Sequence, residues 1–338
     1  MNGSQSHPDS PNETRRRSVV LAAPRGYCAG VTRAVDMVER ALELHGPPVY
    51  VRKEIVHNQH VVEEFRARGV VFVESEAEAP AGAICVLSAH GVSPEVRRNA
   101  AERHLRVIDA TCPLVTKVHT EARRFAQQDR MIVLIGHAEH EEVEGTAGEA
   151  PERTVVVDSV EALDALRLPR DIPIGYLTQT TLAVDDTRHV VEALRERFDD
   201  VQGPPTSDIC YASQNRQVAV KLIAPQCELV LVVGARNSSN SNRLVEVARE
   251  AGTEAHLVPD ETFLDEAWLD GVETVGLTAG ASAPEILVTR VLGRLAKVGY
   301  QDVRHFEATS EDVTFSLPAW LRPDPGRRPD DADGAREA

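Results

Sequence analysis

Short apolar runs alternate with amphipathic helical stretches along most of this 338-residue chain. The runs are rich in β-branched residues and nearly continuous, which is typical of parallel strands that are buried on both faces. Parallel strands need a crossover connection, so the stretches between them are expected to be helices that cover a sheet. The clearest runs span residues 19–22, 84–87, 131–135, 154–157, 174–177, 229–233 and 274–277, and the clearest helices span residues 31–45, 115–128, 160–168, 184–198 and 241–251. The pattern predicts an α/β fold with parallel sheets.

Three cysteines, Cys28, Cys112 and Cys210, stand in equivalent places in this pattern. They are 84 residues (112 − 28) and 98 residues (210 − 112) apart, and each ends an apolar run and precedes a helix-like segment. A thiolate at a helix N-terminus is stabilised by unpaired backbone N–H groups and by the helix dipole. Zinc ribbons and bacterial ferredoxins use close Cys-x-x-Cys runs instead. Three distant thiolates that converge would hold a soft metal with one open position, which indicates catalysis.

The cysteines also divide the chain into parts of similar size. We therefore expect three similar α/β units with parallel sheets, arranged with pseudo-threefold symmetry around a central metal site. Both ends are rich in polar and charged residues with little to bury, which predicts disorder. The predicted divisions are an N-terminal tail (residues 1–17), three units (residues 18–111, 112–206 and 207–318) and a C-terminal tail (residues 319–338).

The overall composition excludes several classes of partner. A net charge of −16 argues against nucleic acid or an anionic membrane as the main partner. No apolar run approaches the roughly 20 residues that a membrane-spanning helix needs. Five cysteines are an odd and sparse set, so a disulfide framework is not expected and a reducing compartment is. The sequence predicts a cytoplasmic protein.

Polar loops follow the predicted strands, at the edge where parallel sheets bind ligands. Hydroxyls, amides, imidazoles and helix N-termini suit phosphate oxygens. Each of these residues alone is more often an ordinary cap or surface group, and Cys85 and Cys227 are expected to be small buried hydrophobes. Neither a dinucleotide-binding motif nor a P-loop is present. The candidate loop residues are His57, His90, His140, Thr180, Ser238, Ser239, Asn240 and Ser282.

Nine motifs in order resemble the 4-hydroxy-3-methylbut-2-enyl diphosphate reductase family, from about residue 18 to about residue 318. They read Pro-Arg-Gly-Tyr-Cys28-Ala-Gly-Val, Val-His57-Asn, Ala-His90-Gly-Val, Asp-Ala-Thr-Cys112-Pro-Leu-Val, His140-Glu-Glu142-Val-Glu-Gly-Thr, Thr-Gln-Thr180-Thr-Leu, Asp-Ile-Cys210-Tyr-Ala-Ser-Gln-Asn-Arg-Gln, Ser238-Ser239-Asn240-Ser-x-Arg-Leu and Gly-Ala-Ser282-Ala-Pro. The resemblance implies the last step of an isoprenoid route, in which the allylic hydroxyl is removed reductively to give isopentenyl and dimethylallyl diphosphates.

The resemblance also implies roles for the candidate residues. Glu142 is the implied proton donor, and Thr180 and His140 position the hydroxyl and the proton path. Reduced ferredoxin or flavodoxin is the implied electron donor. The implied ligands of one [4Fe–4S] cluster per chain are Cys28, Cys112 and Cys210, and the implied diphosphate-binding residues are His57, His90, Ser238, Ser239, Asn240 and Ser282.

The chain departs from the family's common pattern at a few positions. Tyr27 stands where Phe is frequent, Glu141 stands where Pro is frequent, and Glu139 adds a negative charge. Spacing alone does not settle which of the neighbouring glutamates points inward; the resemblance selects Glu142.

Two other functions remain compatible with three cysteines and an open metal position. One is a non-redox [4Fe–4S] dehydratase, similar to quinolinate synthase, which would turn over without an electron donor. The other is a cluster-binding sensor without turnover, although no nucleic-acid-binding motif is present in the sequence.

Overall fold

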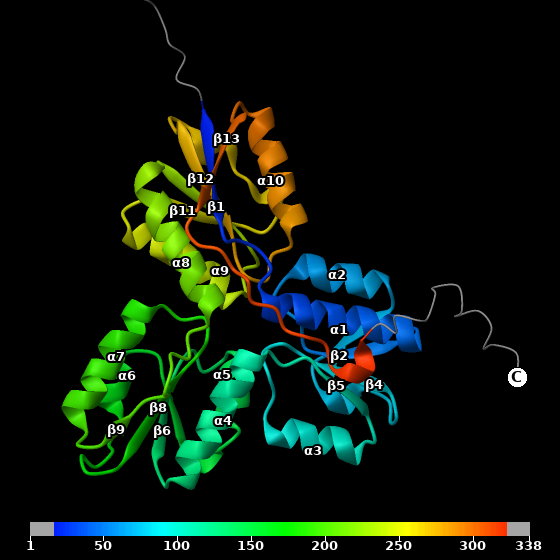
Figure 1. Ribbon diagram of the computed structural model, residues 1–338, viewed down its shortest axis with the longest axis vertical. Coiled ribbons are helices and arrows are strands. Elements are labelled where there is room, and N and C mark those ends of the chain that lie inside the picture. Colours follow the sequence, from blue (N-terminus) through cyan, green and yellow to red (C-terminus); the bar gives the residue numbers. More distant parts are fainter. Residues whose placement is uncertain (1–16, 323–338) are drawn as a thin grey trace, which may run out of the picture.

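Three parallel sheets, each covered by helices, form three lobes around a common centre (Figure 1). The computed structural model describes residues 17–322. Most of the two tails that the sequence predicts to be disordered, residues 1–16 and 323–338, lie outside the described residues. Every strand pairing is parallel, which confirms the predicted α/β class with three similar units.

The first two units share one strand order. Their sheets run β3-β2-β4-β5 and β7-β6-β8-β9, so in each the first strand along the chain lies between the second and third, and the fourth lies at an edge. The first unit contains α1 (Ala29–His45), β2 (Val49–Arg52), α2 (Gln59–Ala67), β3 (Val70–Val73), β4 (Ile84–Leu87), α3 (Pro94–Glu102) and β5 (Arg106–Asp109). The second contains α4 (Pro113–Gln127), β6 (Met131–Ile135), α5 (Glu141–Ala147), β7 (Thr154–Val157), α6 (Val160–Ala165), β8 (Ile174–Thr178), α7 (Val184–Arg197) and β9 (Val201–Gln202).

The third unit repeats this order, but its fourth strand comes from the start of the chain. Its sheet runs β11-β10-β12-β1-β13, and β1 (Ser18–Ala23) pairs with both β12 and β13. The predicted start of the first unit at residue 18 is therefore wrong. Val19 to Ala22 are at most 2% exposed, which suits a strand inside a sheet rather than at its edge. The other elements are α8 (Tyr211–Ile223), β10 (Leu229–Val233), α9 (Ser239–Glu250), β11 (Glu254–Val258), β12 (Thr274–Ala279), α10 (Glu285–Lys297) and β13 (Asp302–Glu307).

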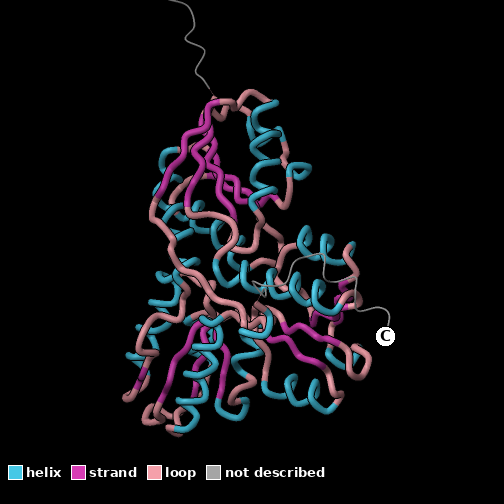
Figure 2. The backbone as a smooth tube through the Cα atoms, turned by 45° about the vertical axis from the view of Figure 1, so that its right-hand side comes forward, coloured by secondary structure: helices cyan, strands magenta, loops and turns pink. Residues whose placement is uncertain are grey.

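The chain after β13 returns to the first unit (Figure 2). Leu321, in a short 3₁₀ helix (Ala319–Leu321), is 0% exposed and packs in the first unit's core, and Arg40 Nε donates to its carbonyl oxygen at 3.1 Å. The prediction of a disordered tail from residue 319 is therefore wrong for residues 319–322. These residues are ordered because an apolar side chain finds a pocket on another unit.

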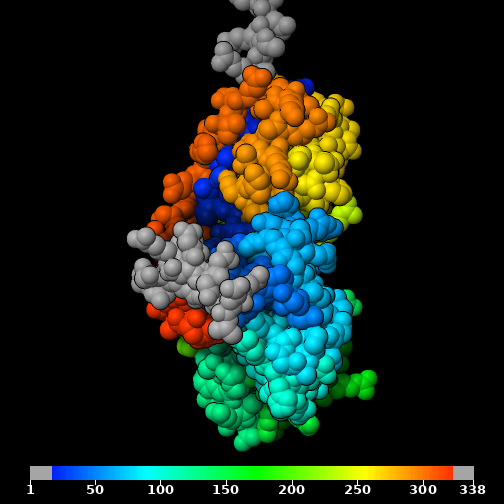
Figure 3. Space-filling view, turned by 90° about the vertical axis from the view of Figure 1, so that its right-hand side faces the viewer, coloured from blue at the N-terminus to red at the C-terminus, as the bar shows by residue number. Residues whose placement is uncertain are grey.

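A buried ion pair fastens this returning segment to the third unit. The Arg216 side chain is 1% exposed and lies 3.0 Å from Glu311 Oε1. Arg216 Nη2 also donates to the carbonyl oxygen of Gly26 at 2.7 Å, just before the first cysteine. The face shown in Figure 3 has the first unit, blue to cyan, packed directly against the third unit, yellow to orange. The three units thus enclose the centre, where the cysteine loops meet.

Candidate active site

Each of the three cysteines stands where the chain passes from one unit to the next. Cys28 follows β1 and is the N-cap of α1. Cys112 follows β5 and is the N-cap of α4, and Cys210 follows β9 and is the N-cap of α8. This confirms that each cysteine begins a helix. Because β1, β5 and β9 each lie beside the third strand of their sheets, the three thiols approach the centre in the same way, although β1 is flanked by β13 and the other two strands lie at an edge.

The three thiols line one central cavity. A Cβ placed on Gly30 would lie 2.7 Å from Cys112 Sγ and 3.8 Å from Cys28 Sγ, so only glycine leaves room between these sulfurs. The pKa of Cys112 is raised to about 12 and that of Cys210 to about 11; burial is the largest cause of both shifts, and neighbouring thiols contribute to them. A thiol that coordinates a metal cation is deprotonated even when its own pKa is high. The donor set therefore fits a soft metal centre.

A buried carboxyl group faces the same cavity. Glu142, in α5, is 3% exposed. Its Oε1 accepts a hydrogen bond from Thr180 N at 2.6 Å, and its Oε2 accepts one from Thr180 Oγ1 at 3.0 Å. Burial raises the pKa of Glu142 to about 7, although these two hydrogen bonds oppose the shift. The group can therefore hold or release a proton near neutral pH.

Three imidazoles form a second wall of the cavity. The rings of His57 and His90 are stacked, with centroids 4.0 Å apart and planes 17° from parallel. His140 is the N-cap of α5 and lies edge-on to both, at 5.4 Å and 5.7 Å. Burial, followed by the neighbouring histidines, lowers the pKa of His140 to about 3, and burial lowers the pKa of His90 as well. These two rings are neutral at physiological pH unless an anion binds beside them.

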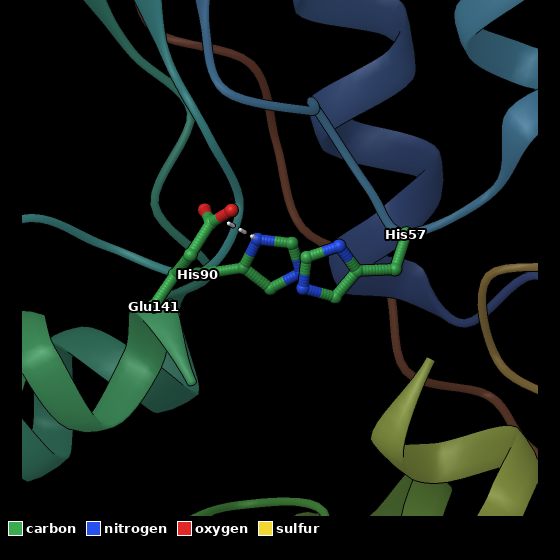
Figure 4. Close-up of side chains that lie close together, drawn as sticks. All are labelled: His57, His90 and Glu141. Carbon is green, nitrogen blue, oxygen red and sulfur yellow. Dashed lines mark ion pairs between the residues drawn. The ribbon is translucent and has the colours of Figure 1, made fainter. Parts of the chain in front are cut away.

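Figure 4 shows that Glu141 points toward the His57–His90 stack. Its Oε2 lies 3.4 Å from His90 Nδ1. The ligand atoms of His57, His90 and Glu141 lie within 4.8 Å of one another, a spacing that a metal ion could also bridge. Glu54 Oε2 lies 3.1 Å from His57 Nδ1.

Hydroxyl and amide groups from the third unit complete the cavity. Asn240 Oδ1 accepts from Ala281 N at 2.7 Å, and Ser282 Oγ donates to the carbonyl oxygen of His57 at 3.1 Å. Ser239 begins α9, and its Oγ lies 3.1 Å from Thr181 Oγ1 in the second unit. These contacts join all three units at the cavity.

The structure gathers almost all of the predicted site residues on this cavity wall. Ser238 is the exception, because it is 0% exposed and lies behind the wall, where its hydroxyl accepts from Asn240 Nδ2 at 2.8 Å. Cys85 and Cys227, expected to be small hydrophobes, pack against apolar clusters away from the cavity. The predicted residues that line the cavity are Cys28, His57, His90, Cys112, His140, Glu142, Thr180, Cys210, Ser239, Asn240 and Ser282.

Sequence reasoning missed some of the cavity wall. Phe315 lines the cavity from the segment that returns to the first unit. Tyr211 lines it beside Cys210, and its hydroxyl accepts a hydrogen bond from Ala29 N, directly after Cys28. Tyr211 could have been noticed by its place beside a candidate ligand. Phe315 carries no local signal, since only the return of the chain brings it to the centre.

Comparisons with known proteins show which family this chain resembles along most of its length. Residues 19–296 match the family model described as LytB protein. The chain is 61% identical over 311 residues to the 4-hydroxy-3-methylbut-2-enyl diphosphate reductase of Nocardia farcinica, with 92% of each chain covered. It is 60% identical over 320 residues to 4-hydroxy-3-methylbut-2-enyl diphosphate reductase 1 of Mycobacterium bovis, with 94% of this chain and 95% of the other covered.

Two solved structures share the fold. The E-1-hydroxy-2-methyl-but-2-enyl-4-diphosphate reductase from Plasmodium falciparum matches with a TM-score of 0.88 and 37% identity, covering 90% of this chain and 97% of that one. A second structure, of (E)-4-hydroxy-3-methyl-but-2-enyl diphosphate reductase, the terminal enzyme of the non-mevalonate pathway, matches with a TM-score of 0.59 and 30% identity, covering 83% of this chain and 99% of that one.

Proposed function

This chain belongs to the LytB family, and we propose on that premise that its central cavity is where an allylic diphosphate loses its hydroxyl group. The chain is a 4-hydroxy-3-methylbut-2-enyl diphosphate reductase, the terminal enzyme of the non-mevalonate isoprenoid pathway, and yields isopentenyl and dimethylallyl diphosphates. One observation carries the assignment of the site: thiols, imidazoles and one buried carboxyl from three units face the same cavity.

Cys28, Cys112 and Cys210 would hold a [4Fe–4S] cluster. The donors fit this group because they are three thiols at helix N-termini, with Gly30 leaving space between two of the sulfurs. When bound, the cluster supplies electrons one at a time and an iron that no protein side chain ligates. The raised pKa values of Cys112 and Cys210 mean that the cluster's charge, rather than the protein alone, would keep these sulfurs deprotonated.

Glu142 is the proposed proton donor. Loss of a hydroxyl as water needs a proton on the leaving oxygen, and the carbon chain needs another. A carboxyl group with a pKa of about 7 is partly protonated at neutral pH, so it can deliver a proton without a large driving force. The two hydrogen bonds from Thr180 fix its orientation, and His140 caps the helix that carries it by accepting from Glu142 N at 3.1 Å.

The diphosphate would bind among His57, His90, Ser239, Asn240 and Ser282. Imidazole and amide N–H groups, hydroxyls and the N-terminus of α9 all donate hydrogen bonds to anionic oxygens. Ser238, which is buried behind Asn240 and Ser282, is better described as a support for them than as a contact with the substrate.

The electrons must come from outside this chain. The sequence carries no dinucleotide-binding motif, so we propose that reduced ferredoxin or flavodoxin delivers them. All five cysteines are free thiols, which supports a reducing, cytoplasmic location. Within residues 17–322, the structure contains no helix with the length and apolar character needed to cross a membrane.

An anaerobic turnover assay tests this proposal. Cluster-containing protein is mixed with the allylic diphosphate and a dithionite-reduced viologen, and the two products are separated and measured. We expect both products only when the reductant is present. Turnover without a reductant would instead indicate a non-redox dehydratase, and cluster binding with no turnover under either condition would indicate a sensor.

A further inference from the structure

The stacked imidazoles of His57 and His90 each have a carboxylate partner of their own. Glu54 Oε2 lies 3.1 Å from His57 Nδ1, and Asn237 Nδ2 donates to the same oxygen at 2.9 Å, which fixes the carboxylate. Glu141 Oε2 lies 3.4 Å from His90 Nδ1, and Ser88 Oγ donates to it at 3.4 Å. The two pairs differ in kind: His57 Nδ1 and Glu54 are hydrogen-bonded, whereas the buried His90 Nδ1 has no hydrogen-bond partner among the described residues and meets Glu141 as an ion-pair contact. Glu54 comes from the same unit as its histidine, and Glu141 reaches across from the second unit.

Glu141 is a charged group in a mostly buried place. Its side chain is only 13% exposed. Burial alone would raise its pKa, but the contact with His90, followed by the charges of His90, His57 and Lys53, lowers the pKa to about 2. A carboxylate beside a proposed anion site would repel the ligand unless its charge were neutralised there. The reaction described above does not use this group.

We propose that Glu141 is a positioning residue for His90: it holds the ring at Nδ1, leaves Nε2 for the diphosphate, and neutralises the proton that His90 takes up when the anion binds. The inference rests on the proposed diphosphate site. Without this carboxylate, burial and the stacked His57 ring would oppose protonation of His90, and only the charge of Glu54, the last and smallest cause, would favour it. With it, the imidazolium has an anion on each nitrogen, and the pair of Glu141 and His90 adds no net charge to repel the ligand.

The other charged and titratable groups around His90 do not replace Glu141. His57 stacks on the His90 ring, and Glu54 is hydrogen-bonded to His57 Nδ1. His140 lies edge-on with its ring centroid 5.7 Å away, and its Nδ1 accepts from the backbone N–H of Glu142. Because each stacked imidazole already has its own carboxylate, the cluster of His57, His90 and Glu141 is explained without the metal ion that its spacing would also allow.

The test is the number of protons taken up when inorganic pyrophosphate binds the cluster-containing protein. Anaerobic calorimetry in two buffers with different ionisation enthalpies gives this number at one pH. Protons exchanged by pyrophosphate itself are the same for every variant, so differences between variants belong to the protein. Near pH 8, we expect E141Q to take up about one proton fewer than the wild type when it binds pyrophosphate. As the pH rises, the affinity of the wild type should therefore fall faster than that of E141Q, by up to about tenfold for each pH unit. E141D, which keeps the charge, should restore part of the uptake.

E144Q is the matched control. Glu144 lies on the same helix and carries the same charge, but its carboxylate is 57% exposed and pairs with Lys53 at 3.2 Å. We expect E144Q to keep the wild-type proton uptake. Wild-type uptake in E141Q, or an equal loss in E144Q, would overturn the inference while leaving the diphosphate site intact. If pyrophosphate binds neither the wild type nor any variant, the proposed diphosphate site is itself wrong and the inference falls with it.

Discussion

Replacing Glu142 by Gln separates the geometry of this residue from its proton. The buried carboxyl group receives hydrogen bonds from Thr180 N at 2.6 Å and Thr180 Oγ1 at 3.0 Å. A glutamine has the same shape and can still accept from Thr180 N through its amide oxygen, while the Thr180 hydroxyl can rotate to accept from its NH₂ group. The cluster and the substrate should therefore bind as in the wild type, and only the supply of a proton is removed.

The expected loss of activity follows from the proposed role of Glu142 as the proton donor. A positioned general acid contributes about 100- to 10,000-fold to a rate, so the kcat of Glu142→Gln should fall by this amount with little change in KM. The pH dependence gives a second measure. Because burial raises the pKa of Glu142 to about 7, the wild-type donor is protonated below that pH and loses its proton above it. Wild-type kcat should therefore fall above pH about 7, and the residual rate of Glu142→Gln should lack this decline.

The assay is steady-state reduction of the allylic diphosphate with reduced viologen, at several pH values, on protein with a full complement of iron. Glu139→Gln and Glu144→Gln are the controls, since neither residue lines the cavity. Both should keep most of the wild-type rate. A near wild-type rate in Glu142→Gln, together with an inactive neighbour, would refute the assignment of the proton donor.

Three further perturbations test other parts of the structure. Arg216→Met leaves the partners of a 1% exposed arginine unpaired and should lower the free energy of unfolding, measured with denaturant, by about 3–5 kcal/mol. Arg170→Ala, at an ion pair whose side chains are 68% and 58% exposed, should lower it by less than about 1 kcal/mol. Equal effects would contradict a stabilising role for the buried pair of Arg216 and Glu311. His57→Ala and Asn240→Ala should each weaken pyrophosphate binding by about 1.5–3 kcal/mol in calorimetry, with the cluster spectrum unchanged; unchanged affinity in both would move the anion site elsewhere. Gly30→Ala should lower the iron content without removing a ligand, because the new Cβ would lie 2.7 Å from a cysteine sulfur. Normal iron content would show that the space between the sulfurs accommodates a methyl group.

The sequence predicted the positions of the cysteines well because the signals there are local. An apolar run, a cysteine and a helical stretch follow each other directly, and Cys28, Cys112 and Cys210 are all helix N-caps in the structure. The strand at residues 131–135 and that at residues 229–233 were also predicted with their observed bounds. Such short buried strands are recognisable because β-branched apolar runs have few other uses.

Partners that are distant in sequence could not be predicted in this way. The place of β1 between β12 and β13 depends on which sheet lacks a fourth strand, and nothing within residues 18–23 specifies it. Likewise, Leu321 and Phe315 lie in a polar, proline-containing stretch whose order depends on pockets that other parts of the chain supply. Strand β13 (Asp302–Glu307) was missed because it is mostly exposed and carries charged side chains.

The place of Glu141 shows a different limit. Glu141 was recognised in the sequence as a departure from the family's common pattern, but no role was predicted for it. Its distance to His90 Nδ1 is set by α5 of one unit and the loop after β4 of another. A contact between units leaves no trace in local spacing, so only the structure could suggest what this carboxylate does.

The central claim is that three cysteines from three unit junctions hold one iron–sulfur cluster, and iron content tests it most directly. Anaerobically purified wild-type protein should contain about four irons per chain. Single Cys→Ser changes at Cys28, Cys112 and Cys210 should each abolish or severely reduce this content, while Cys85→Ser and Cys227→Ser should leave it unchanged. Full iron content in the first three variants, or loss of iron in either of the last two, would contradict the account.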